Sequence, residues 1–167
     1  MLFRSDKQES MLEYAKHNFA INEMSVDAHL GDFASWEDGG RVFDMVISNP
    51  PFYDSQVTQS ENIPLNIARY AHHLPFEAFV LRVKKVLKPR GWFLFCYDAK
   101  QIDILLSSLK KHHLNPEVIQ FVHSKIDRES KLVMIAARKN SKSMTKILAP
   151  FIVLDRKSTR LNSSHRL

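Results

Sequence analysis

The sequence Asn49-Pro50-Pro51-Phe52 places a carboxamide, two ring-constrained residues and an aromatic side chain at the end of an apolar run. Each proline fixes its own φ and forces the residue before it into an extended conformation. The backbone at Asn49 and Pro50 is therefore stiff, and its carbonyl groups cannot be absorbed into a helix. We expect this segment to be a rigid holder of hydrogen-bond acceptors and to form the catalytic motif.

Acceptors held in this way suit an exocyclic amino group, such as N6 of adenine. That nitrogen is a poor nucleophile because its lone pair is delocalised into the ring. The side-chain oxygen of Asn49 and the carbonyl oxygen of Pro50 can each accept one N–H group and turn the lone pair toward an electrophile, without a strong general base. Phe52 or Tyr53 would stack on the base. An ordinary Pro-Pro turn is the alternative interpretation.

The elements that must position this motif alternate between apolar runs and amphipathic stretches. Apolar spacing predicts helices at 8–21, at 75–90 with Gly91 as the C-cap, and at 100–112, and strands at 26–33, 41–48, 92–98, 118–123 and 131–137. This alternation indicates an open, mostly parallel α/β sheet, with ligands bound beyond the carboxyl ends of the strands. The run at 41–48 is typical of a central strand covered on both faces. The last two strands are joined too closely for a parallel crossover, so we expect an antiparallel hairpin.

Length and composition fit one globular domain of 167 residues, 44% of them hydrophobic. No apolar run reaches the roughly 18 residues of a membrane span, and the N-terminus has no signal-peptide pattern, so we expect a cytoplasmic protein. The single cysteine, Cys96, lies in the apolar run 92–97 and is expected to be a buried structural thiol. The histidine pairs at 72–73 and 112–113 lack cysteine or spaced acid partners, so we expect no metal.

The net charge of +6 is unevenly distributed along the chain. Residues 6–99 contain 9 basic and 13 acidic side chains, whereas residues 100–155 contain 10 basic and 5 acidic ones. A half that carries the chemistry and a half that faces nucleic acid would account for this difference, and a solvated basic face is the alternative. Residues 1–5 and 156–167 have the composition of non-native or disordered ends, so the predicted domain covers residues 6–155.

The order of these elements and the motif resemble the class I S-adenosylmethionine-dependent methyltransferases, whose Rossmann-like sheet is mostly parallel and ends in an antiparallel hairpin. The resemblance implies that Asp6, in the segment DKQESMLEYAKHN, binds the cofactor ribose hydroxyls. It also implies that Asp32, in GDF, meets the cofactor adenine, that Phe33 adds an adjacent contact, and that Asn49 borders the same site. A helix-capping acid and a turn acid are the alternative roles for Asp6 and Asp32.

Glycine content departs from the pattern of that family. Its members place a glycine-rich loop after the first strand to cradle the methionine part of the cofactor, whereas the glycines here are Gly31, Gly39, Gly40 and Gly91, with no G-x-G. Only five residues precede Asp6, and a strand, loop, helix and second strand need about 30 residues. We therefore expect an N-terminally truncated domain that lacks the first strand and the glycine-rich loop.

Longer segments, at residues 66–97, 122–139 and 148–155, are similar to the bacterial tRNA1(Val) (adenine-N6)-methyltransferases, which modify the adenine 3′ of the anticodon. This resemblance implies methyl transfer from S-adenosylmethionine to N6 of an adenine, with tRNA as the partner. Ribosomal-RNA guanine-N2 methylation and protein glutamine-N5 methylation stay open, because those enzymes share the NPPF motif. A non-catalytic RNA-binding fragment also stays open, because the glycine-rich loop is absent.

Basic side chains outside the motif are candidates for RNA contacts. Arg69 follows the motif and could contact a phosphate or cap a helix. Lys125, Arg128 and Lys131 lie in the predicted hairpin and could form a phosphate track or a solvated turn. Together with Tyr53, these residues form the predicted RNA-binding set.

Overall fold

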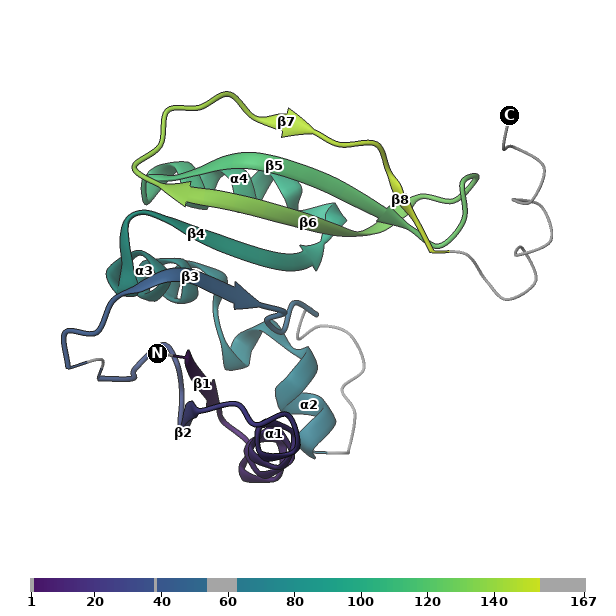
Figure 1. Ribbon diagram of the computed structural model, residues 1–167. Helices are drawn as coiled ribbons and strands as arrows, with labels where there is room; N and C mark the ends of the chain where they lie inside the picture. Colours follow the sequence, from purple (N-terminus) through teal and green to yellow (C-terminus); the bar gives the residue numbers. More distant parts are fainter. Residues whose placement is uncertain (1, 38, 54–62, 154–167) are drawn as a thin grey trace.

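The computed structural model describes residues 2–37, 39–53 and 63–153, and the basic tail at 156–167 lies outside these ranges. In these ranges the chain forms two β-sheets (Figure 1). The smaller sheet pairs β1 (Leu2–Asp6) with β2 (Val26–Leu30) in parallel. The larger sheet has six strands in the order β3-β4-β6-β5-β7, with β8 also paired to β5. None of the described helices is long and apolar enough to cross a membrane.

The larger sheet contains the antiparallel hairpin that the sequence predicts, formed by β5 and β6, and continues beyond it with two short strands that the sequence does not predict. Its strands are β3 (Phe43–Ser48), β4 (Leu87–Asp98), β5 (Leu114–His123), β6 (Ser130–Lys139), β7 (Lys146–Ile147) and β8 (Phe151–Ile152). β3 is parallel to β4, and β7 and β8 are parallel to β5. β6 runs antiparallel to both β4 and β5, so the predicted α/β architecture is confirmed.

Two helices cover one face of the larger sheet and form the core with it. The helices of the chain are α1 (Glu9–Ile21), α2 (Ile63–Arg69), α3 (Phe76–Val86) and α4 (Ile102–Lys111), with single 3₁₀ turns η1 (Ala71–His73) and η2 (Ala99–Gln101). α3 and α4 lie behind the sheet in Figure 1, whereas α1 lies in front. The apolar stripes of α3 and α4 pack on alternate residues of the strands. The hydrophobic core that they form includes Phe79, Val83, Phe93, Phe95, Tyr97, Leu105, Leu109 and Ile135.

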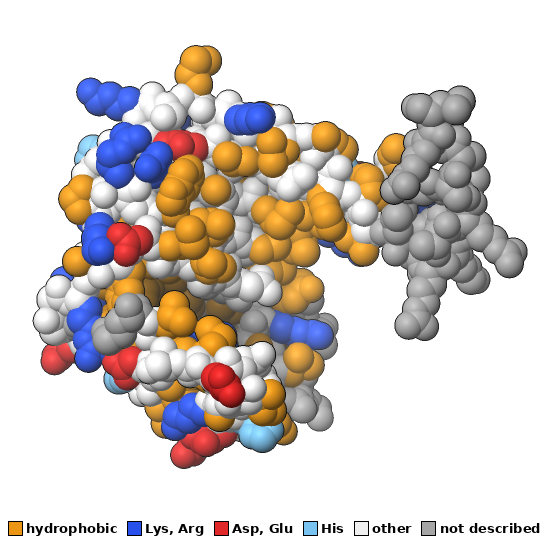
Figure 2. Space-filling view, viewed as in Figure 1, with side chains coloured by type: hydrophobic (Ala, Val, Ile, Leu, Met, Phe, Trp, Pro, Cys, Tyr) orange, Lys and Arg blue, Asp and Glu red, His pale blue; other side chains and the backbone are white. Residues whose placement is uncertain are grey.

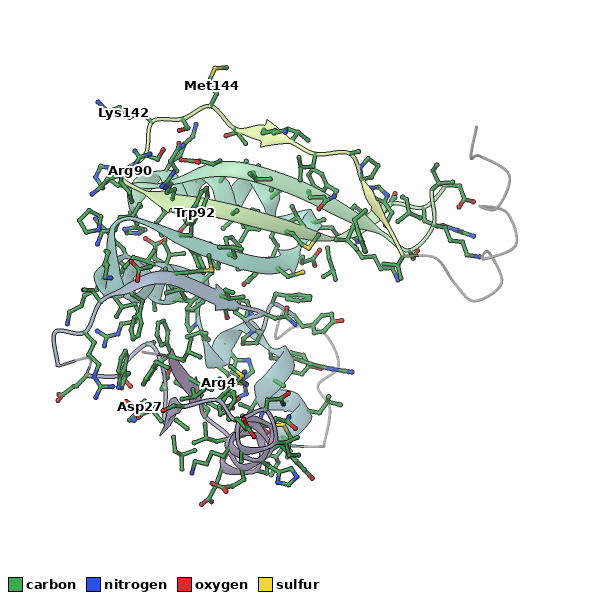
Figure 3. All side chains as sticks on the ribbon, in the orientation of Figure 1. Arg4, Asp27, Arg90, Trp92, Lys142 and Met144 are labelled. Atoms are coloured by element: carbon green, nitrogen blue, oxygen red, sulfur yellow. The ribbon has the colours of Figure 1, made fainter. Side chains whose placement is uncertain are left out.

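The start of the chain belongs to the fold. Residues 2–5, expected to be non-native or disordered, form most of β1, and Phe3 stacks on Trp36 with ring centroids 4.1 Å apart. Phe3 also lies 5.7 Å from Phe43 at the start of β3. The expectation that residues 2–5 stand outside the domain is therefore wrong, because an apolar strand with a parallel partner buries its aromatic side chain there. Figure 3 labels Arg4 on β1 and Asp27 on β2.

β3 does not have the two covered faces that its apolar sequence predicts. It is the edge strand of the larger sheet, and the side chains of Met45 and Ile47 are 47% and 73% exposed. Val46, which points to the opposite face, packs against the core under α3. The prediction is wrong for one face because β3 has β4 on one side and no hydrogen-bonded strand among the described residues on the other.

The predicted C-cap at Gly91 is also wrong. α3 ends at Val86, and Leu87 is already extended, with φ −84° and ψ 135°, and begins β4. Gly91 lies inside β4, where an added Cβ would come within 3.1 Å of the Asp44 carbonyl oxygen and 3.0 Å of the Lys88 carbonyl oxygen. Glycine is therefore required there for close approach of two backbones and not for ending a helix.

Candidate active site

The Asn49–Phe52 motif leaves the carboxyl end of β3 and is fixed by backbone hydrogen bonds to a distant segment. The amides of Phe52 and Tyr53 both donate to the carbonyl oxygen of Arg69, at 3.0 and 2.8 Å. The amide of Ala71 donates back to the Tyr53 carbonyl oxygen at 2.9 Å. The loop is thus held by both its own prolines and the end of α2, as a rigid holder of acceptors requires.

The residues of the motif differ in burial. Asn49 is exposed at the strand end, whereas Pro50 is buried beneath it. The ring of Phe52 is half-buried, packs against the core and lies 5.4 Å from the ring of Tyr97. Tyr53 is 45% exposed. Phe52 therefore anchors the loop, and Tyr53 has the free ring surface that stacking on a base needs.

A residue that sequence reasoning missed supports the motif from the other side. The side-chain amide of Gln101, at the end of η2, donates a hydrogen bond to the Phe52 carbonyl oxygen at 3.1 Å. This satisfies a backbone acceptor of the loop that the two prolines leave without a helical partner. A glutamine that follows a predicted strand carries no distinguishing signal, because its partner lies 49 residues away.

Asp6 lies at the carboxyl end of β1 with both carboxylate oxygens engaged. Oδ1 accepts a hydrogen bond from the amide of Gln8 at 3.1 Å, and Oδ2 pairs with the Arg4 guanidinium at 3.0 Å. The Asp6 carbonyl oxygen accepts the Gly31 amide at 2.8 Å, which joins the ends of β1 and β2. Asp6 lies two residues before Gln8, the N-cap residue of α1, and no side chain caps this helix. The Asp6 carboxylate therefore does not have the alternative role of a helix-capping acid, and it is half-buried.

Asp32 lies just beyond the end of β2 and shapes the turn that follows. Its Oδ1 accepts a hydrogen bond from the Ala34 amide at 2.9 Å, as in an Asx turn, and its Oδ2 pairs with the Lys7 ammonium at 2.8 Å. Phe33 next to it is half-buried, with its ring 5.8 Å from Phe79 and edge-on to it. The structure therefore places Phe33 mainly in the aromatic contact with α3.

Lys7 is the second residue that sequence reasoning missed. Its ammonium bridges the Asp32 carboxylate and the carbonyl oxygen of His73, to which it donates at 2.5 Å. His73 ends η1, and η1 begins directly after Tyr70, which pairs with Tyr53. Lys7 therefore links the ends of β1 and β2, which carry Asp6 and Asp32, to η1, the turn that follows the segment bound to the Asn49–Phe52 loop.

Two titratable side chains near the motif stay neutral at pH 7. Burial raises the pKa of Tyr97 to about 12, and the nearby Asp98 charge adds to this. Burial, followed by the charges of His72 and Lys7, lowers the pKa of His73. Within the described ranges no three His, Cys, Asp or Glu side chains gather as metal ligands. Among the residues that the structure describes, the groups beside the motif offer hydrogen-bond acceptance and positioning.

The predicted RNA-binding residues lie at the same end of the sheet but do not form one cluster. Arg69 is exposed, and its backbone, as described, holds the motif. Lys125, Arg128 and Lys131 are exposed on the hairpin between β5 and β6, which projects beyond β4 (Figure 1). β6 and β5 are the second and third strands from β3, so the hairpin lies about 10–15 Å across the sheet from the motif. That separation suits contacts to different nucleotides.

The adenosine half of a nucleoside cofactor fits the residues that are present. Asp6 and Asp32 offer carboxylate oxygens at adjacent strand ends, with the N-terminus of α1 close to Asp6. Of the described glycines, Gly31 lies at the end of β2, Gly39 and Gly40 lie in the turn that precedes β3, and Gly91 lies inside β4. None of the four directly follows β1 or the carboxyl end of β3, where a cradle for the methionine group would have to lie. The residues present therefore fit the ribose and the base of the cofactor, and they do not fit its methionine part.

Comparison with protein families gives one match that covers most of the chain. Residues 2–101 match the methyltransferase small domain. A tRNA1(Val) (adenine(37)-N6)-methyltransferase of Phocaeicola vulgatus is 26% identical over 136 residues, which are 78% of this chain and 56% of the relative. The protein of the same name from Pedobacter heparinus is 27% identical over 50% of this chain and 36% of its own length. The chain thus spans about half the length of the curated relatives it matches or less.

Solved structures share the fold at low sequence identity. A predicted O-methyltransferase from Agrobacterium tumefaciens superposes with a TM-score of 0.65 and 14% identity, over 90% of this chain and 67% of the other. An S-adenosylmethionine-dependent methyltransferase from Clostridium acetobutylicum superposes with a TM-score of 0.58 and 12% identity, over 83% and 75% of the two chains. The arrangement of the two sheets therefore corresponds to a known α/β architecture.

Proposed function

The chain belongs to the methyltransferase small domain family, and on this premise we propose that it transfers a methyl group from S-adenosylmethionine to N6 of an adenine in tRNA. The anticodon loop of tRNA1(Val) is the proposed substrate. The names of the relatives from Phocaeicola vulgatus and Pedobacter heparinus support this choice. The observation that carries it is the exposed Asn49 at a strand end, followed by two prolines in a loop whose Phe52 and Tyr53 backbone is hydrogen-bonded to Arg69 and Gln101.

Asn49 and Pro50 position the acceptor nitrogen. S-adenosylmethionine supplies the methyl group as an electrophile. The Asn49 side-chain oxygen and the Pro50 carbonyl oxygen accept the two N–H groups of the adenine, which directs the nitrogen lone pair out of the ring plane. The proton becomes acidic once the nitrogen has attacked, so a strong base is not required. Pro51 keeps Pro50 extended, and Phe52 holds the loop against the core.

Asp6 and Asp32 bind the adenosine part of the cofactor in this proposal. A carboxylate is a strong acceptor for ribose hydroxyls, and Asp6 keeps its orientation through the Gln8 amide. Asp32 takes the adenine amino group, with Lys7 as its fixed counter-charge and Phe33 as an adjacent contact. Asn49 borders the same space from β3. No metal takes part in this chemistry.

tRNA contacts extend from the motif to the hairpin. Tyr53 stacks on the target adenine once that base has turned out of the RNA stack. Arg69 contacts a flanking phosphate. Lys125, Arg128 and Lys131 contact phosphates farther along the stem-loop, as the separation across the sheet allows. A tRNA substrate places the proposed activity in the cytoplasm.

A chimaera tests the proposal, because the chain spans only part of its relatives. Residues 2–153 replace the matching region of the Phocaeicola vulgatus relative, and the chimaera is incubated with S-adenosylmethionine and tRNA1(Val). Mass spectrometry of the digested RNA should show N6-methyladenosine, lost in the Asn49→Ala chimaera. The product 2-methylguanosine in ribosomal RNA, or methylated glutamine in a protein, would replace this function with one of its two enzymatic alternatives.

A non-catalytic role is favoured by one observation, the absence of a G-x-G sequence among the four glycines. A folded chimaera that binds tRNA1(Val) and transfers no methyl group to any acceptor would establish that role instead. Circular dichroism of the chimaera distinguishes this outcome from failure to fold.

A further inference from the structure

Basic side chains gather at the end of the larger sheet that lies farthest from the Asn49–Phe52 loop. We call this end the rear surface and define it as segments 84–90, 110–117 and 138–142. These segments contain one acidic side chain, Glu117, and nine basic ones. The basic side chains are Lys84, Lys85, Lys88, Arg90, Lys110, Lys111, Arg138, Lys139 and Lys142. Figure 2 shows Lys and Arg side chains gathered at the upper left, where Figure 3 labels Arg90 and Lys142.

Hydrogen bonds between the segments hold these charges on one surface. The Lys139 ammonium donates to the carbonyl oxygens of Lys84 and Leu87, each at 2.6 Å, and so joins the end of β6 to the end of α3. The Asn140 amide donates to the His113 carbonyl oxygen at 2.8 Å and joins the turn after β6 to the turn before β5. The segments therefore form a single fixed surface.

Arg138 is held in one orientation on the rear surface. Its Nε donates to the Arg90 carbonyl oxygen at 2.9 Å, and its guanidinium lies 4.8 Å from the ring centroid of Trp92. A guanidinium has five N–H donors, and this hydrogen bond uses one of them. An arginine fixed in this way loses little side-chain freedom when it binds a phosphate.

Acidic side chains offset only part of the charge. Lys88 pairs with Asp44 at 2.9 Å, and Lys111 pairs with Glu77 at 2.7 Å. These two ion pairs and Glu117 offset at most three of the nine basic charges. Burial, followed by the charge of a neighbouring lysine, lowers the pKa of Lys139. Crowded like charges destabilise a fold, so they suit a surface that meets an anion.

Helix ends account for four of the nine charges. Lysines in the last turn complement the helix dipole, as Lys84 and Lys85 do in α3 and Lys110 and Lys111 do in α4. The other five lie in strands and turns, where the backbone has no comparable dipole. They are Lys88, Arg90, Arg138, Lys139 and Lys142. This excess indicates an anionic partner.

The rear surface is more basic than the hairpin to which the sequence analysis assigns RNA contacts. The hairpin segment 124–131 has three basic and two acidic side chains. β4 runs from Leu87 at the rear surface to Asp98 at the end of the sheet that carries the motif. This span is about 36 Å at about 3.3 Å per residue, whereas charges are screened within about 8 Å at physiological ionic strength. The rear surface must therefore contact its partner directly.

We propose that the rear surface binds phosphates of the substrate tRNA outside the anticodon stem-loop. This inference rests on the proposed function, which brings the anticodon loop to Asn49, about 36 Å away. A stem of about five base pairs extends only about 17 Å at about 3.4 Å per pair, so an isolated stem-loop does not reach the rear surface. Whole tRNA continues beyond that stem and supplies the phosphates.

An acidic protein segment fits the rear surface less well than RNA does. The cores of protein–protein interfaces are depleted of lysine, whereas seven of the nine basic side chains here are lysines. Phosphate contacts, by contrast, are made by lysine and arginine side chains that need no apolar centre between them.

The salt dependence of binding to two RNAs tests the proposal. Whole tRNA1(Val) and its anticodon stem-loop are each titrated with the full 167-residue chain at several salt concentrations. The rear variant, Arg90→Gln with Lys142→Gln, removes two exposed charges of the rear surface. Each phosphate contact to a duplex contributes about 0.9 to the log–log salt slope, so the slope for whole tRNA should fall by up to about 1.8 units. The slope for the stem-loop should stay unchanged.

The matched control removes two charges elsewhere. Lys16→Gln with Lys146→Gln changes exposed lysines on α1 and β7 and should leave both slopes unchanged. Circular dichroism establishes that each variant is folded. An unchanged slope for whole tRNA in the rear variant, or an equal fall in the control variant, would overturn the proposal.

Footprinting gives a readout that needs no variant. Hydroxyl-radical cleavage of whole tRNA bound to the unmodified chain should show protected riboses outside the anticodon stem-loop, and protection confined to the stem-loop would contradict the proposal. Tighter binding of polyglutamate than of tRNA at the same salt concentration, lost in the rear variant, would assign the surface to an acidic protein instead.

Methylation separates this inference from the proposed function. If the chimaera methylates the stem-loop while the rear variant leaves the slope for whole tRNA unchanged, the proposed function stands and the rear surface has no RNA role. If the chimaera methylates no RNA while the rear variant lowers that slope, the RNA contact stands and the proposed methyl transfer fails.

Discussion

The side-chain amide of Gln101 holds the carbonyl oxygen of Phe52 at 3.1 Å, across 49 residues of sequence. The bond ties the catalytic loop after β3 to the turn after β4, its neighbour in the sheet. In the proposed mechanism Asn49 and Pro50 place the acceptor nitrogen, so we expect Gln101 to act as a positioning residue through the loop.

Gln101→Ala should therefore lower the single-turnover rate of the chimaera while cofactor affinity changes little. A loop displaced by a fraction of an ångström loses about tenfold to a hundredfold in rate. The matched control is Gln120→Ala, which removes an equivalent bond to the Ala149 carbonyl oxygen at 3.0 Å away from the motif. Equal rates for the two variants would show that Gln101 has no positioning role.

Asn49→Ala should abolish methyl transfer and leave cofactor affinity within a few-fold. In the proposed mechanism the Asn49 side chain contacts the adenine amino group as that group becomes the nucleophile, so its loss should act mainly on the transition state. Rapid-quench measurement with the chimaera gives the rate, and calorimetry gives the affinity. Asn18→Ala, at an exposed position on α1, is the control. A rate within tenfold of the unmodified chimaera would remove Asn49 from the mechanism.

The chain by itself should bind S-adenosylmethionine weakly or not at all. In the proposed binding mode Asp6 and Asp32 offer acceptors for the adenosine half, whereas the described residues provide no cradle for the methionine half. Isothermal titration of the 167-residue chain should show no saturation at micromolar ligand. Micromolar affinity would mean that the two carboxylates and Asn49 suffice.

Replacing Lys125, Arg128 and Lys131 with alanine should weaken tRNA binding chiefly at low salt. Each phosphate contact to single-stranded RNA contributes about 0.7 to the log–log salt slope, so the slope should fall by up to about two units. Filter binding of an anticodon stem-loop to the chimaera at several salt concentrations measures this.

The control for this prediction removes the same charge elsewhere. Lys110, Lys142 and Lys146 are exposed lysines outside the hairpin, and their triple alanine variant should retain most of the slope. Equal slopes in the two triple variants would indicate a diffuse effect of net charge and would take the hairpin out of the RNA site.

Glu77 should make stability fall in acid. Hydrogen bonds from Lys111, Ser108 and His112 lower the pKa of Glu77 from 4.5 to about 2. A lowered folded-state pKa means that the stabilisation is complete above pH 4.5 and is lost as pH falls toward 2. Urea unfolding between pH 2 and 6 should therefore show a shallower decline for Glu77→Gln than for the unmodified chain. The same decline in both proteins would show that other acids account for it.

The parts of the fold that depend on local pattern follow from the sequence, and those that depend on distant partners do not. The stripe containing Phe79 and Val83 correctly places α3 under the sheet, because burial there follows helical period. The exposure of Ile47 could not be predicted, since an apolar strand sequence does not reveal which strands lie beside it.

Within the candidate site, Asn49 can be singled out from the sequence because two prolines follow it. Lys7 and Gln101 cannot, because their acceptors are backbone carbonyls 66 and 49 residues away.

The division into two sheets has a consequence for cooperativity. β1 and β2 are joined to the rest by aromatic contacts, Lys7 and Gln8, with no ladder of backbone hydrogen bonds to β3 in the described ranges. The strands β4, β6 and β5 share a continuous ladder and the whole core. We therefore expect the smaller sheet to open at a lower free energy than the larger one, so that the chain unfolds as two units of unequal stability. Asp6 and Asp32 belong to the weaker unit and Asn49 to the stronger, so the proposed site would form only while both units are folded.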